Sequence, residues 1–218
     1  MEKIEKTNQN NAKREEKILK PYDFKIFDRY SVSDIKIGDV GLKNVINLNE
    51  KLVLKSHGRY KKQFGKTRVN VIERMIGYLG VPGHRGKKHK IQTSWATGKY
   101  EKNAKIMLDA LKLIEEKTKT NPIQILVKAI ENSAPCDEVT TIEYGGARYP
   151  QAVDISPLRR LALALRNIVH GGYDKAFNKK VSISEGLATE IVAASEKSNE
   201  SFAIIKRNES EKQADSAR

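Results

Sequence analysis

The chain has little of what builds disulfide-rich or membrane-spanning proteins. It has one cysteine, Cys136, in 218 residues, so an internal disulfide is impossible and we expect a protein of the reducing cytoplasm. No apolar run approaches the roughly 18 residues that cross a bilayer. The first residues, Met1–Lys6, have no apolar segment after their charges, so we expect no secretory signal. Aromatic residues make up only 6% of the chain.

Patterns that carry catalysis are also missing from the sequence. No paired carboxylates stand out on a common helix face, because the acids are mostly interleaved with lysines, and no serine stands in a Gly-x-Ser-x-Gly turn. His84 and His89 are five apart, but Arg85 and Lys88 beside them would repel a metal ion. We therefore predict no enzyme, no metal site, no cofactor and no small-molecule substrate. An RNA-modifying enzyme would need a cofactor or metal motif.

Positive charge is what the chain has in excess. It contains 41 lysines and arginines against 27 acids, a net charge of +14 with a pI near 9.7. The segment 55–90 holds eleven basic residues and the single acid Glu73, a net of +10. Such a one-sided excess predicts a polyanionic partner. A membrane-surface protein would need a basic helix with bulky aromatics, and this segment is rich in glycine instead.

Apolar residues at helical spacing predict a mainly α protein with five or six helices. The clearest stripes fall in 69–79, 99–118, a helix begun by Asn121-Pro122, a helix begun by Ser156-Pro157, a helix capped at Ser182, and a polar helix over 200–215. Gln124 is placed to complete the cap at Asn121. Gly171-Gly172 should end the Ser156 helix and leave His170 at its C-terminus.

A β-hairpin is predicted near 138–155. β-branched residues precede Gly145-Gly146, which can adopt the positive φ of a tight turn, and a returning strand follows. Pro150 cannot donate to a ladder, so the ribbon should stand free as an arm rather than inside a sheet. Residues 1–65 are predicted to form an N-terminal extension, partly irregular and basic toward its end, and 66–218 the helical domain.

One long motif gives the chain a family resemblance. Gly-Gly-Ala-Arg-Tyr followed by Val-Asp-Ile-Ser-Pro-Leu-Arg-Arg, within 145–160, resembles the S7 family of small-subunit ribosomal proteins. The resemblance includes Gly98–Ala104, Thr120–Leu126 and Phe202–Arg207, and covers roughly 66–218. The chain ends without an aromatic tail, which is similar to the archaeal and eukaryotic branch.

The resemblance implies a structural protein of the cytoplasmic ribosome. It would bind the 3′ major domain of small-subunit rRNA, help assemble the head beside neighbouring head proteins, and lie near the exit site for tRNA and mRNA. From the charge pattern and the resemblance together we expect RNA contacts from the basic segment, from the arm, and from the helices around them: Arg59, Lys61, Lys62, Lys66, Arg68, His84, Arg85, Lys87, Lys88, Lys90, Lys99, Lys102, Gly145, Gly146, Arg148, Tyr149, Arg159, Arg160, Arg166, Lys206 and Arg207.

The first strand of the arm departs from the bacterial members of this family, which usually place several arginines there. Thr140, Ile142 and Glu143 stand at that place here. The alternative to a ribosomal role is a DNA-binding protein that uses the hairpin as a wing and the Ser156 helix in a groove. Competition between duplex DNA and structured RNA would separate the two.

Overall fold

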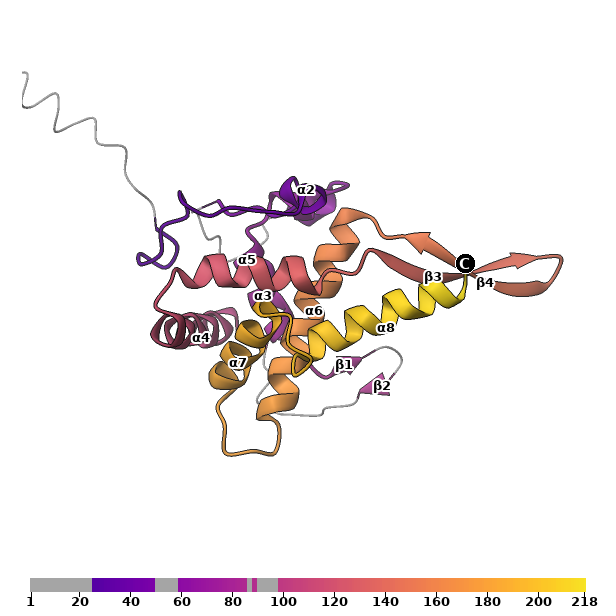
Figure 1. Cartoon of the computed structure of the whole chain (residues 1–218). Coiled ribbons are helices and arrows are strands. Elements are labelled where there is room, and N and C mark those ends of the chain that lie inside the picture. The colour runs from indigo at the N-terminus through magenta and orange to yellow at the C-terminus, as the bar shows by residue number, and fades with distance from the viewer. Residues whose placement is uncertain (1–24, 50–58, 86–87, 90–97) are drawn as a thin grey trace, which may run out of the picture.

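Helices make up most of the chain that the computed structural model describes, which is residues 25–49, 59–85, 88–89 and 98–218. They are α2 (Val40–Lys43), α3 (Val71–Leu79), α4 (Tyr100–Thr118), α5 (Pro122–Ser133), α6 (Pro157–Ala176), α7 (Ile183–Ser195) and α8 (Phe202–Ser216), with 3-10 turns η1 (Arg59–Lys61) and η2 (Gly65–Arg68). Two antiparallel ribbons complete the fold: β1 (His84–Arg85) with β2 (Lys88–His89), and β3 (Asp137–Tyr144) with β4 (Ala147–Asp154). The predicted mainly α bundle with a hairpin arm is confirmed (Figure 1).

Local capping sets where several helices begin. The Asn70 and Asn121 side chains accept hydrogen bonds from the backbone N–H groups of Ile72 and Ile123. Ser182 and Glu185 form the reciprocal capping box that their spacing predicts. Pro157 occupies the first turn of α6, where a missing N–H costs nothing.

The core lies where the apolar stripes of α3 to α7 meet. The stripe predicted over 69–79 consists of Val69, Ile72, Ile76 and Leu79, and that of α5 of Ile123, Leu126, Val127 and Ile130; all eight are buried. In α6, Leu161, Leu165 and Ile168 are fully buried, whereas Leu158 at the start of the helix is half-buried. The phenol of Tyr173, further along α6, donates to the Leu79 carbonyl at the end of α3 over 3.1 Å. This bond joins α3 to α6, and burial raises the pKa of Tyr173 to about 12.

The segment before α3 also contributes to the core. Ile26 and Leu42 are fully buried, and the Glu131 carboxylate on α5 accepts the backbone N–H of Gly38 over 2.6 Å. Gln124 does not cap α5 as expected. Its side-chain amide instead accepts from the Lys36 N–H and donates to the Lys36 carbonyl, so it holds an extended segment against the bundle.

The prediction that Gly171-Gly172 ends the Ser156 helix is wrong, because α6 continues to Ala176. These glycines serve packing instead. A Cβ at Gly171 would lie 2.5 Å from Cδ of Glu190, and one at Gly186 on α7 would lie 2.5 Å from the Gly172 carbonyl oxygen. The helices α6 and α7 therefore approach with their backbones almost in contact, which only residues without a side chain allow.

Replacing Gly186 with alanine should destabilise the fold by about 2–3 kcal/mol. The added methyl group would meet a backbone carbonyl, which cannot rotate away as a side chain can. Urea unfolding measures the effect.

Gly77→Ala is the matched control for this prediction. Gly77 also lies within a helix, but nothing stands within 4 Å of a Cβ there. Alanine should therefore stabilise α3 by about 0.5–1 kcal/mol. Equal effects from the two substitutions would contradict close packing of α6 on α7.

The arm projects from the bundle and is braced at its base by α8 (Figure 1). The Ser210 hydroxyl donates to the Asp137 carbonyl over 3.0 Å, and the Arg218 guanidinium reaches the Asp137 carboxylate at 2.7 Å. Across the ribbon, Arg159 of α6 pairs with Glu138 at 2.7 Å. The base of the arm is thus held by α6 and α8, while the contacts described at its tip join its own two strands.

Candidate nucleic-acid interface

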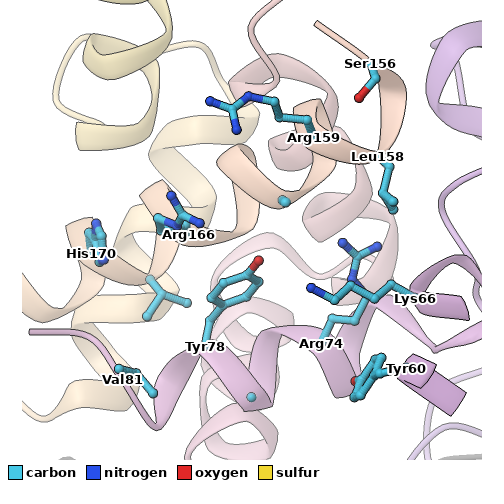
Figure 2. A pocket seen from close by; sticks show the side chains of 13 residues that line it. Tyr60, Lys66, Arg74, Tyr78, Val81, Ser156, Leu158, Arg159, Arg166 and His170 are labelled. Carbon is cyan, nitrogen blue, oxygen red and sulfur yellow. The ribbon is translucent and has the colours of Figure 1, made fainter. Parts of the chain in front are cut away.

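A hollow of about 930 Å³ opens between α3, the turns η1 and η2, and α6 from its N-terminus to His170. Side chains from all of these elements face into it (Figure 2). Its lining residues are Tyr60, Lys66, Arg74, Gly77, Tyr78, Val81, Ser156, Leu158, Arg159, Ala162, Arg166, Val169 and His170. The site therefore joins the basic segment to the arginine-bearing helix, which are about ninety residues apart in the sequence.

The charge in this hollow has one sign. Four lining residues are lysine or arginine, and among the described residues that line it there is no acid. Arg166 is exposed and has no ion pair among the residues that the structure places. Arg159 is exposed as well, although Glu138 holds one side of its guanidinium. Cations on a concave, acid-free surface concentrate an anion such as a phosphate backbone.

Arg74 is the most unusual member of the hollow. Only 6% of it is exposed, and no described group hydrogen-bonds its Nη1 nitrogen. Burial lowers the pKa of its guanidinium, and the phenol groups of Tyr78 and Tyr60 partly oppose that shift. The sequence interpretation treated α3 as a core helix and did not single out Arg74 or Tyr78. The only sequence feature that could have pointed to this site was an arginine next to the buried stripe of a short helix.

Two of the arginines that were predicted to contact RNA form ion pairs with carboxylates of the protein itself. Arg85 makes two bonds to the Asp174 carboxylate, at 2.6 and 2.8 Å, and also donates to the His170 carbonyl. Arg160 pairs with Asp39 at 2.8 Å and donates to the Pro135 carbonyl. Both guanidinium groups are mostly buried. Their position fits a role in joining segments of the fold, and RNA contact there remains a prediction.

The tip of the arm, which projects from the bundle (Figure 1), presents another group of predicted residues. Gly145 and Gly146 have φ values of +59° and +82°. A residue with a side chain would be strained at either position, so the turn requires glycine. Arg148 lies 3.5 Å from Glu143 across the ribbon. Tyr149 is exposed opposite Ile142, and Tyr144 is 82% exposed on the same face. The sequence interpretation missed Tyr144, although it stands next to the turn.

The other predicted residues divide by location. Lys61, Lys62 and Arg68 are exposed beside Lys66, and Lys99 and Lys102 are exposed where α4 begins. On α8, Lys206 pairs with Glu209 and Arg207 with Glu211. The side chains of Arg59, His84 and Lys88, and all of Lys87 and Lys90, lie outside the described residues.

His170 forms one end of the hollow rather than the C-terminal cap that the sequence suggested. It lies within α6 and is 7% exposed. Burial, with repulsion from Arg85 and Arg166, lowers its pKa from 6.5 to about 4, against the weaker opposing effect of Asp174. The imidazole is therefore neutral in the folded protein at pH 7.

This shift predicts a pH dependence of folding. Because protonated His170 is favoured in the unfolded chain, its contribution to stability is complete above pH 6.5. It decreases by up to about 3 kcal/mol as the pH falls toward 4. The difference in urea unfolding free energy between pH 7 and pH 4.5 should be smaller in His170→Phe by about 2–3 kcal/mol. The carboxylates titrate in both proteins, so identical pH profiles would contradict a buried neutral histidine.

Two features were sought in the part of the chain that the structure describes, a cluster of metal-ligating side chains and a membrane-spanning helix. No three histidine, cysteine or acidic residues cluster there as a metal site. No helix within the described ranges is both long and apolar enough to cross a membrane.

The fold is a helical bundle with a projecting β-ribbon arm, and its hollow is lined by cations with no acid among the described lining residues. These features place the chain in the class of small basic proteins that bind a folded polyanion. Comparison with known families is more specific. The family described as Ribosomal protein S7p/S5e matches residues 43–218, and the chain belongs to this family.

Similar proteins from three organisms carry the name small ribosomal subunit protein uS7. The relative from Nanoarchaeum equitans is 48% identical over 195 residues, which cover 89% of this chain and 98% of the relative. Those from Picrophilus torridus and Methanosphaera stadtmanae are 44% and 42% identical, over 88% and 89% of this chain and 98% of each relative. These organisms fit the archaeal branch that the C-terminus suggested.

Proposed function

We propose that this chain is a structural, non-catalytic protein of the small ribosomal subunit. It binds the 3′ major domain of small-subunit rRNA and helps to assemble the head of the subunit, in the cytoplasmic ribosome. Membership of the family supports the ribosomal role. The observation that supports RNA as the ligand is the hollow between α3 and α6, where four cations meet and none of the described lining residues is an acid.

The exposed cations extend this surface beyond the hollow. Lys61, Lys62 and Arg68 flank it, and the start of α4 adds Lys99 and Lys102. Lysines on turns can follow several backbone strands of a folded RNA, and arginines can hold a phosphate with two parallel bonds. Such contacts fix the position and orientation of the protein on the RNA.

The arm suits a different part of the assembly. Its tip is free of the bundle and exposes Tyr144 and Tyr149 on one face, where unpaired bases can stack. We propose that the arm lies near the exit site beside tRNA and mRNA. Neighbouring head proteins are the proposed partners of other faces of the bundle.

Duplex DNA is the weaker alternative ligand. A helix that reads a groove must present an exposed face of polar side chains, but half of the residues of α6 are buried in the bundle. Its exposed arginines face the hollow beside α3 rather than an open surface. The burial of α6 therefore argues against its use as a recognition helix beside a hairpin wing.

Binding to the isolated 3′ major domain of small-subunit rRNA tests the proposal. The titration is repeated over a range of salt concentrations and with excess duplex DNA as competitor. Tight binding that survives the competitor is the expected result. If about eight phosphates are neutralised, the slope of log K against log salt should be near −6. Weak binding that the DNA abolishes would reduce the protein to a general polyanion binder.

A further inference from the structure

Buried arginines in this fold otherwise have carboxylate partners. Arg85 is paired with Asp174, and Arg160 with Asp39, each within 2.8 Å. Arg74 is more buried than either, at 6% exposed. Its Nη1 nitrogen has no hydrogen-bond partner among the described residues, and no carboxylate is among the groups that act on its charge.

Leaving a guanidinium in this state is costly to the folded protein. A buried cation loses its hydration, and without an ion pair the phenol groups of Tyr78 and Tyr60 offset only part of that cost. An apolar side chain of similar length would fill the same space on α3 without the cost. The position of Arg74 on the wall of an open hollow indicates that its partner is an anion from outside the chain.

Other groups around the hollow favour the same kind of ligand. Lys66 and Arg166 extend into it from opposite sides, and the Tyr78 hydroxyl points into the space between α3 and α6 (Figure 2). The N-terminus of α6 lies at its edge, where the Ser156 side chain makes no capping hydrogen bond. A helix N-terminus carries partial positive charge, and together with arginine it suits the oxygens of a phosphate.

We propose that this hollow contains a phosphate subsite with Arg74 on its wall, and that it receives one phosphodiester of the bound RNA. The inference rests on the proposed function and makes it more specific. Most lysines of the surface would meet phosphates in water, where each contact is weak and screened. Arg74 would meet its phosphate where water is partly excluded, and a charge-assisted hydrogen bond is stronger there.

The free protein tests the subsite without RNA. Its melting temperature is measured in inorganic phosphate and in sodium chloride of equal ionic strength. Phosphate at ten times its dissociation constant should raise the melting temperature by about 3–6 °C. Arg74→Met should abolish this rise, and Lys128→Met, at an exposed position of α5 outside the hollow, should keep it.

The melting temperature of Arg74→Met in chloride gives a second, independent readout. If Arg74 serves the ligand, methionine removes an unpaired buried charge, and the variant should melt at the same temperature as the parent or higher. A much lower melting temperature would mean that Arg74 stabilises the fold, and would overturn the proposal. So would a rise with phosphate that persists in Arg74→Met. Arg74→Lys keeps the cation but not the planar fork, and should retain only part of the rise.

Binding to the rRNA fragment separates this inference from the proposed function. Arg74→Met should weaken binding by about 10–100-fold and make the salt slope shallower by about one unit. If the parent protein binds the fragment and Arg74→Met binds equally well, the subsite is wrong and the ribosomal role stands. If the parent does not bind in the presence of duplex DNA, the proposed function itself fails.

Discussion

Arg166→Glu should weaken binding to the rRNA fragment by about 100-fold. Arg166 is exposed on α6, faces the hollow and has no ion pair in the described part of the chain. Reversal of its charge places a carboxylate next to RNA phosphates, and such like-charge contacts cost several kcal/mol. Equilibrium binding at one fixed salt concentration measures the loss.

The control for this prediction is Lys128→Glu. It makes the same change of two charge units at an exposed position on α5, outside the hollow. A general effect of net charge would weaken binding equally in both variants and would contradict a specific interface at α6. Unfolding of Arg166→Glu in urea should match the parent, because no described contact is lost.

Glu190→Ala should destabilise the protein by about 3–5 kcal/mol. The Glu190 carboxylate is completely buried between α6 and α8. It accepts hydrogen bonds from the Ser201 hydroxyl at 2.7 Å and the Ala203 N–H at 3.0 Å, and it lies 2.8 Å from the Lys175 ammonium. Alanine would leave those donors unpaired in the interior and open a cavity against Gly171. Urea unfolding measures the loss.

Glu209→Ala is the comparison for Glu190. Glu209 also forms an ion pair with a lysine, Lys206, but both side chains are nearly half exposed. A surface pair of this kind contributes little, so the substitution should change stability by less than about 0.5 kcal/mol. If Glu190→Ala also changed the free energy of unfolding by less than about 0.5 kcal/mol, the prediction that this carboxylate holds α7 against the start of α8 would be wrong.

Elements governed by local chemistry were predictable from the sequence. Of the predicted stripe Leu158, Leu161, Leu165 and Ile168, the last three are fully buried and Leu158 is half-buried. The prediction succeeded because residues three and four apart share a helix face wherever that helix packs. The Gly145-Gly146 turn was predicted for the same kind of reason, since two adjacent glycines relieve the steric cost of positive φ. The family motif added a function that periodicity alone could not supply.

Elements governed by distant partners were not predictable. Gly171 and Gly172 look like a helix end in sequence, and only the approach of α7 explains why they lie inside α6. Gln124 looks like a capping residue, but the segment at Lys36 takes its amide. In both cases a tertiary contact outweighs a local preference that is worth little on its own.

The candidate site divides in the same way. The sequence by itself determined that the chain is basic, that 55–90 carries most of the excess charge, and that α6 presents arginines, because charge and helical period are read directly from residue order. Only the tertiary structure decided which cations act together. It turned Arg85 and Arg160 toward Asp174 and Asp39, and brought Lys66, Arg74 and Arg166 to one acid-free hollow. Ion pairing and burial depend on distances across the fold, and residues far apart in the chain meet only when helices pack.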